Sequence, residues 1–160
     1  MLLKVRQCDN RYLTFRTIRS DSESCARNEN LLQDWSLGEP DLFGYRLIES
    51  SQARGYFLTS PNIEGRPAKL SQTKEDLKVK WKFVDVRFRY AGHPAPNFTG
   101  CIFLMSRLIP LQNNTGKRAR MKEHELGVTD ERIDNGAPII LWHHKGIYCS
   151  EPRNQIWTLV

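Results

Sequence analysis

The sequence predicts an all-β domain, and three observations support this prediction. An aromatic residue followed by leucine occurs three times, and the successive leucines are 45 and 46 residues apart. Tryptophans in similar mixed polar and apolar surroundings also occur three times, and the first two are 46 residues apart. Short runs of strand-forming residues alternate with clusters of Gly, Pro, Asn and Ser. The leucines are Leu13, Leu58 and Leu104, and the tryptophans are Trp35, Trp81 and Trp157.

This spacing predicts three weakly similar repeats of four short strands each. One such unit cannot bury its apolar face, but three units around a threefold axis close a barrel and remove most open strand edges. The predicted fold class is therefore a β-trefoil, formed by one domain of 160 residues with repeats at about 1–40, 41–86 and 87–160. Because each repeat carries one of the three tryptophans, we expect all three to pack in the common core.

The candidate strands follow one another along the chain. In the first repeat they are 2–6, 12–16 and 33–37, and the third strand is unclear around Cys25. In the second repeat they are 45–49, 55–60, 68–71 and 80–86. In the third repeat they are 87–90, 101–106, 138–142 and 156–160.

The third repeat is predicted to contain an insertion at about 107–134. The leucine and the tryptophan of a repeat are 22 and 23 residues apart in the first two repeats but 53 residues apart in the third. Within this stretch, 113–116 reads Asn-Asn-Thr-Gly, which is a turn signal, and 117–126 is polar and helix-prone.

Composition and charge restrict the partners and the location of the protein. The formal net charge of +6 permits an acidic partner such as a nucleic acid, an anionic membrane or a sulfated glycan. No stretch approaches the roughly 18 apolar residues of a membrane span. The first residues contain no apolar run long enough for a signal peptide, so we expect a cytoplasmic protein, or a secreted one if a signal has been removed.

The sequence contains no recognisable catalytic or metal-binding motif, so no enzymatic activity, metal or cofactor is expected. His143 and His144 are adjacent, so on a strand they point to opposite sides and cannot readily share a metal ion. The four cysteines lack CxxC spacing and are interpreted as free, mostly buried thiols, with two disulfides as the alternative in a secreted protein. They are Cys8, Cys25, Cys101 and Cys149.

The C-terminal segment carries the most specific pattern in the chain. An Asn-Gly turn leads into an apolar strand ending in Leu-Trp at 135–142, and Asn-Gln-Ile-Trp-Thr-Leu follows at 154–159. The first repeat keeps a Gln-x-Trp element at 33–35. This arrangement resembles the ricin B-type lectin repeat, closely over 135–160 and as a repeat plan over the whole chain.

The resemblance implies a shallow carbohydrate pocket in the third repeat, where an aromatic platform stacks on a sugar ring. The residues assigned to this pocket are Asp134, Trp142, His143, Asn154 and Gln155. Trp142 matches the platform, Asn154 matches the polar residue before the Gln-x-Trp element, and Gln155 matches a structural glutamine. The family's pocket aspartate is absent from the expected turn at 92–99, which leaves Asp130 or Asp134 as the candidate acid.

The second repeat is not expected to form a pocket, and the first repeat carries only part of the pattern. In the second repeat, Leu70 and Ser71 stand where the platform would lie. In the first, Asp9 and Asn10 stand in the appropriate turn but have no aromatic partner.

The predicted function is that of a lectin that recognises glycans or glycoproteins. Two alternatives remain open. The first is a protein-binding β-trefoil, such as a protease inhibitor, that acts through the 107–134 loop. The second is a binder of sulfated or other anionic glycans through the basic run at 117–122, whose affinity would fall steeply with salt.

Overall fold

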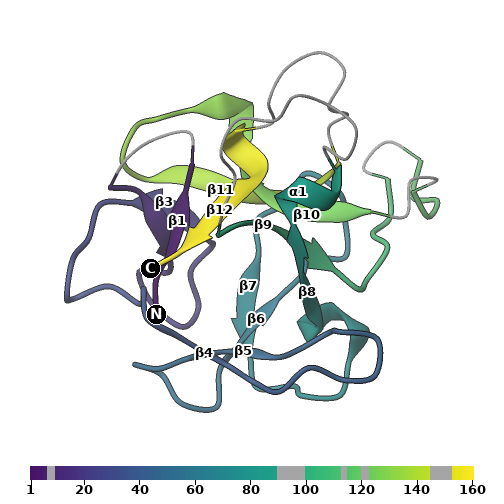
Figure 1. The fold of residues 1–160 in the computed structure, drawn as a ribbon, viewed down its shortest axis with the longest axis horizontal. Coiled ribbons are helices and arrows are strands. Elements are labelled where there is room, and N and C mark those ends of the chain that lie inside the picture. Colours follow the sequence, from purple (N-terminus) through teal and green to yellow (C-terminus); the bar gives the residue numbers. More distant parts are fainter. Residues whose placement is uncertain (7–9, 90–99, 113–114, 120–122, 145–152) are drawn as a thin grey trace.

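The computed structural model describes residues 1–6, 10–89, 100–112, 115–119, 123–144 and 153–160, and these residues form an all-β fold (Figure 1). The strands within them are β1 (Leu3–Val5), β2 (Tyr12–Thr14), β3 (Glu23–Cys25), β4 (Trp35–Leu37), β5 (Ile48–Ser50), β6 (Phe57–Thr59), β7 (Lys69–Ser71), β8 (Trp81–Asp85), β9 (Cys101–Ser106), β10 (His124–Val128), β11 (Ala137–His143) and β12 (Ile156–Leu159). The helices are the 3-10 helices η1 (Leu77–Val79), η2 (Thr129–Glu131) and η3 (Arg153–Gln155), and the short α1 (Val86–Arg89).

Six of these strands form a closed, barrel-like sheet. Antiparallel pairing joins β1 to β12, β12 to β9, β9 to β8, and β4 to β5. A bridge between Arg46 and Trp81 links the start of the β5 segment to β8, and the Trp35 N–H donates to the Met1 carbonyl to link β4 to β1. Closure of this kind removes the open edges that would otherwise pair with other chains.

The remaining strands form three antiparallel hairpins, β2–β3, β6–β7 and β10–β11. They meet at Ser22, which contacts the other two hairpins. Its N–H donates to the Ala68 carbonyl, its hydroxyl donates to the Ile139 carbonyl, and the same hydroxyl accepts from the Ala68 N–H. All three residues are completely buried. Because an unpaired buried polar group is costly, these bonds hold the three hairpins in one arrangement.

The three tryptophans lie in one hydrophobic core, as the sequence predicts. Trp35, Trp81 and Trp157 are at most 1% exposed. The indole N–H of Trp81 donates to the Leu58 carbonyl and that of Trp157 donates to the Leu126 carbonyl, each at 2.9 Å. The buried indole nitrogen of Trp35 has no hydrogen-bond partner among the described residues.

Two predicted elements are wrong. The segment predicted as a strand at 87–90 forms the helix α1 as far as Arg89. The segment predicted to be helix-prone, 117–126, leads into the strand β10, which pairs with β11 along its whole length. All residues of β10 are buried, so packing against its neighbours overrides the local preference for a helix.

Leu104 is not the counterpart of Leu13 and Leu58, contrary to the prediction. Leu104 lies in β9, a barrel strand, whereas Leu13 and Leu58 lie in the hairpin strands β2 and β6. Leu126 in β10 matches Leu58 in β6 instead, because its carbonyl accepts the Trp157 indole N–H just as the Leu58 carbonyl accepts the Trp81 indole N–H. The stretch predicted as an insertion, 107–134, contains the strand β10 and the helix η2, and the segment between β9 and β10 is 107–123.

Cys25 and Cys101 are buried free thiols, as predicted. Cys8, Cys149, Asp9 and the turn at 92–99 lie outside the described residues. Among the described segments, none of the helices is long and apolar enough to span a bilayer. The described His, Cys, Asp and Glu side chains form no group of three that could hold a metal ion.

Candidate functional site

The strand pairing of the three hairpins identifies one equivalent position in each, and a different residue occupies it in each hairpin. The matched pairs are Leu13 with Ser24, Leu58 with Leu70, and Leu126 with Leu141. The next residue in the second strand of each hairpin is Cys25, Ser71 and Trp142, respectively. Of these three positions, therefore, the one in β11 alone carries an aromatic side chain. It is half-buried, whereas Cys25 is buried.

A cavity of about 620 Å³ lies beside Trp142. Its volume is within the range of roughly 300–1,000 Å³ found for small-molecule sites. Its walls come from the segment after β6, the segment between β9 and β10, the end of β10 with η2, and β11 with η3. The lining residues are Glu64, Gly65, Gln112, Thr115, Gly127, Val128, Thr129, Asp130, Ile140, Trp142, Asn154 and Gln155.

Glu64 is one carboxylate of the cavity wall, and two histidines orient it. Its Oε2 lies 2.7 Å from Nε2 of His124, which is fully buried at the start of β10. The same oxygen lies 3.7 Å from Nδ1 of His143. No described residue donates a hydrogen bond to the other oxygen, Oε1, and the side chain keeps 16% of its surface exposed. Glu64 is thus held in place while part of it remains accessible from the cavity.

Asp130 is the second carboxylate of the wall. It lies in η2 with φ +50°, and Glu131 follows with φ +54°, so both occupy the left-handed region that non-glycine residues rarely adopt. Aspartate tolerates this region better than most residues because its short side chain can bond locally. Such conformations cluster at functional sites. Asp130 is exposed, so its carboxylate is accessible where it borders the cavity.

Gly127 allows Asn154 and Gln155 to approach β10 closely. A Cβ at position 127 would lie 2.8 Å from Cγ of Gln155 and 2.9 Å from the carbonyl oxygen of Asn154. Real Cβ atoms essentially never make contacts this short, so a larger residue would displace both neighbours. The close approach seats both side chains on the cavity wall.

Asn154 and Gln155 also hold the two strands of the hairpin in place. The side-chain amide nitrogen of Asn154 donates to the Val128 carbonyl at 2.9 Å, and that of Gln155 donates to the His143 carbonyl at 3.1 Å. Both residues are almost completely buried, at 6% and 1% exposure. The amide groups therefore join η3 to the ends of β10 and β11.

The structure brings together Trp142, Asn154 and Gln155 of the residues assigned from the sequence, and it places Asp134 and His143 outside the cavity lining. Asp134 is exposed and bonds with Arg132. The hydrogen bond from Arg132 outweighs desolvation and holds the pKa of the Asp134 carboxyl below its ordinary value. His143 contacts Glu64 and the Trp142 ring, whose centroid is 4.8 Å from its own.

His143 and His144 contact different glutamates, in keeping with the expectation that they point apart. His143 approaches Glu64, whereas Nδ1 of His144 lies 2.9 Å from Oε2 of the buried Glu125. The ring of His144 also packs edge-on against Phe103 in β9.

Sequence reasoning did not find Glu64, Gln112 or Thr115. Glu64 belongs to the segment after β6 and reaches the cavity only because the hairpins pack together. Gln112 and Thr115 lie in the stretch between β9 and β10, where no local pattern distinguishes a wall residue from a loop residue. The bridge between Ile63 and Leu111 brings these two segments side by side.

No family model and no curated protein sequence matches this chain. Solved structures do match, over nearly its whole length. ThreeFoil, a designed threefold symmetric protein, has a TM-score of 0.68 at 19% identity, with 99% of this chain and 96% of ThreeFoil covered. The Rhizoctonia solani agglutinin gives 0.63 at 15% identity, with 99% and 91% covered. SeviL, solved with asialo-GM1 saccharide, gives 0.60 at 15% identity, with 99% and 94% covered. These similarities show an all-β fold with β-trefoil neighbours.

Proposed function

We propose that this protein is a lectin that binds uncharged glycans in the cavity beside Trp142. The observation that carries the proposal is the half-buried indole on the same wall as two carboxylates, Glu64 and Asp130. An indole face can cover the apolar face of a sugar ring, and carboxylate oxygens are strong acceptors for its hydroxyl groups. The fold shared with an agglutinin and with SeviL, which was solved with asialo-GM1 saccharide, supports the same function.

The proposal retains the repeat plan, with residues 1–160 as one domain and the pocket in its third repeat. Trp142 is the platform, and Asn154 and Gln155 hold the wall behind it. Glu64 and Asp130 are the hydroxyl acceptors in place of Asp134.

The charge of the wall favours an uncharged ligand over an anionic one. The lining contains two carboxylates, and no lysine or arginine is among its described residues. A sulfated glycan in this cavity would meet like charges without a balancing cation, which costs affinity. The lining also favours a lectin over an inhibitor that acts through the loop after β9, because Gln112 and Thr115 of that loop form part of the cavity wall.

A glycan array tests the proposal, with wild type, Trp142→Ala and Trp142→Phe measured at low and high salt. We expect wild type to bind an uncharged glycan at both salt concentrations. Trp142→Ala should weaken binding by roughly 30-fold or more, as expected for a residue worth about 2 kcal/mol. Trp142→Phe keeps an aromatic face and should retain part of the affinity. Thermal unfolding of each variant establishes that the fold is intact.

Glu64→Gln separates the acceptor role from the shape of the wall, because the amide has nearly the same size but is a weaker acceptor. We expect it to weaken the same glycan by about tenfold, which corresponds to about 1.4 kcal/mol. Binding of sulfated glycans alone, at low salt and unaffected by Trp142→Ala, would refute the proposal, as would the absence of any glycan binding.

A further inference from the structure

The turn between β4 and β5 presents two adjacent bulky apolar side chains to solvent. Leu42 is fully exposed, at 101%, and Phe43 is 65% exposed. We refer to residues 41–44 as the Leu42–Phe43 tip. A single exposed leucine is ordinary, but a leucine and a phenylalanine side by side at the apex of an ordered turn indicate a contact surface.

Internal hydrogen bonds hold the turn of the tip in one conformation. The Asp41 carboxylate accepts hydrogen bonds from the N–H groups of Phe43 and Tyr45 at 2.9 and 3.0 Å, and the Asp41 carbonyl accepts from the Gly44 N–H at 3.0 Å. Gly44 has φ +86°, which a residue with a side chain would adopt only with strain. The turn is thus fixed, and three consecutive N–H groups can leave water without losing a partner.

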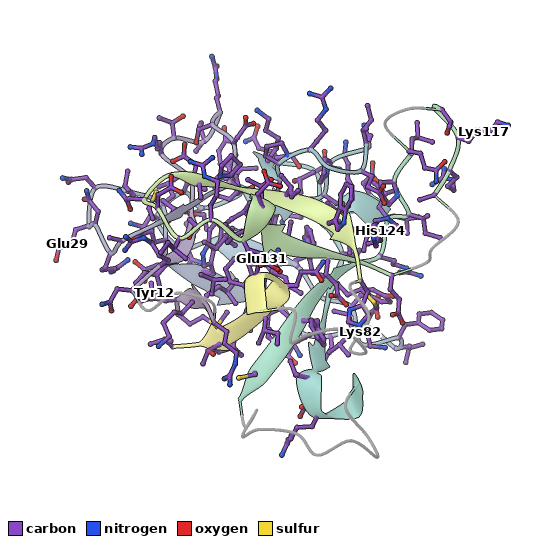
Figure 2. The ribbon with its side chains drawn as sticks, turned by 90° about the horizontal axis from the view of Figure 1, so that it is seen from above. Tyr12, Glu29, Lys82, Lys117, His124 and Glu131 are labelled. Atoms are coloured by element: carbon purple, nitrogen blue, oxygen red, sulfur yellow. The ribbon has the colours of Figure 1, made fainter. Side chains whose placement is uncertain are left out.

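Positively charged side chains surround the base of the tip. The guanidinium of Arg107 lies 5.5 Å from the ring centroid of Phe43 and 5.2 Å from that of Tyr45. The ammonium of Lys82 lies 5.6 Å from the Tyr45 centroid. Lys80 is close enough to favour the ionised form of Asp41. Figure 2 shows Lys82 toward the same side of the molecule as Lys117, away from Glu29.

The two acidic residues of the loop do not cancel this charge. Asp41 is paired with Arg107 and bonded to its own turn. Desolvation opposes its ionisation, but the amides of Tyr45 and Phe43, followed by Arg107, hold the pKa of Asp41 below its ordinary value. Glu39 is exposed two residues earlier in the chain. Three cations, Lys80, Lys82 and Arg107, therefore accompany the two carboxylates of this loop.

We infer that the Leu42–Phe43 tip inserts into the surface of an anionic lipid bilayer. Leu42 and Phe43 enter the boundary between head groups and acyl chains, and the surrounding cations contact the anionic head groups. Apolar insertion and attraction to anionic lipid act together in this mode of binding. The bonded N–H groups of Phe43, Gly44 and Tyr45 need no hydrogen bond from the surrounding medium.

Two features favour a bilayer over a protein partner. A stable protein interface buries about 800 Å² on each side, which is far more than two side chains on one tight turn provide. A protease or another strand-binding partner needs an extended segment with free backbone groups, whereas this backbone is folded into a turn and bonds to itself. A lipid surface requires only apolar side chains with cations around them.

Sedimentation with glycan-free vesicles tests this inference. The vesicles are phosphatidylcholine alone, or phosphatidylcholine with about 30% phosphatidylserine, a fraction chosen to give an anionic surface. We expect wild type to bind the anionic vesicles more strongly, and to bind less in high salt. The double variant Leu42→Ser/Phe43→Ser should lower the partition coefficient by at least about tenfold. Ile133→Ser removes an apolar side chain of similar exposure, 62%, and should bind like wild type.

Two further measurements separate this inference from neighbouring explanations. Trp142→Ala should bind the vesicles like wild type, so failure of the lectin proposal leaves this result unchanged. Phe43→Trp should show a blue-shifted emission on anionic vesicles and quenching by brominated lipid, whereas Ile133→Trp should show neither. Equal binding by the double variant and wild type would overturn the inference. So would an equal loss in Ile133→Ser, or binding without a spectral change in Phe43→Trp.

Discussion

The hairpins β2–β3 and β10–β11 share a register but differ in what fills the space beside them. Thr14 and Gly127 each follow the matched leucine of the first strand. In the first hairpin, the Thr14 hydroxyl accepts from the side-chain amide of Gln33, which is completely buried. In the third, position 127 has no side chain, and Gln155 lies against its backbone.

The side chains of Gln33 and Gln155 also form different hydrogen bonds. Gln33 donates to the Thr14 hydroxyl and to the Ala26 carbonyl, and its own oxygen accepts from the Asn28 N–H and from Arg27. Gln155 bonds to the end of β11 and borders the cavity. Where the first hairpin has the Thr14 side chain, the third therefore has Gln155 packed against a glycine, and it also carries Trp142 in place of Cys25 beside a cavity.

Placing threonine, the residue at position 14 of the first hairpin, at the equivalent Gly127 of the third hairpin should have the largest effect on stability. Gly127→Thr forces the new Cβ against Gln155 and the backbone of Asn154, so we expect the free energy of unfolding to fall by about 2 kcal/mol. Denaturant titration measures the change. Gly38→Ala is the control, because its Cβ would make only ordinary contacts of 3.5–3.6 Å and should cost less than half as much. Equal losses in the two variants would mean that the close approach at Gly127 is not a constraint.

The tryptophans offer a smaller and more selective test. Trp157→Phe removes the donor to the Leu126 carbonyl, whereas the indole nitrogen of Trp35 has no partner among the described residues. Both changes remove similar volume, but the first also leaves a buried acceptor unpaired. We expect Trp157→Phe to destabilise the protein by about 1 kcal/mol more than Trp35→Phe. Unfolding curves that coincide for the two variants would contradict this assignment.

The smallest effect concerns Cys25, which occupies the position of Trp142 in the first hairpin. Burial, followed by the nearby Glu23, raises the pKa of the Cys25 thiol above its ordinary value. The thiol should therefore remain protonated and react slowly with iodoacetamide at pH 8, since the thiolate is the reactive form. Peptide mass spectrometry after timed labelling across pH 7 to 10 measures the rate at this residue alone. Rapid labelling at pH 8, with the fold intact, would show that the site is more open than its burial indicates.

Sequence reasoning predicted the elements that depend on local pattern. Leu13, Leu58 and the buried tryptophans mark strands whose burial follows from their alternation and spacing. The local sequence predicted the wrong element at β10, because this helix-prone segment forms a strand only through its pairing with β9 and β11. It also matched Leu104 with Leu13 and Leu58, since the apolar strands of the barrel and of the hairpins have similar sequences.

The candidate site was predictable only in part. Trp142, Asn154 and Gln155 belong to one continuous segment with a recognisable pattern, so the sequence identified them. Glu64 reaches the same wall from a different hairpin, and only the packing of β6–β7 against β10–β11 brings it there. Gly127 carries no chemical group, so its role is visible only from the close approach of its neighbours.

The pairing of β1 with β12 has a consequence for how the chain folds. Leu2 and Val160 exchange two backbone hydrogen bonds, and the N and C labels lie side by side in Figure 1. The contacts that seal the barrel thus join residues separated by almost the whole sequence. During synthesis, β1 cannot pair with β12 until β12 has left the ribosome. Such distant pairing makes the last step of folding slow, because a long loop must close before those contacts form.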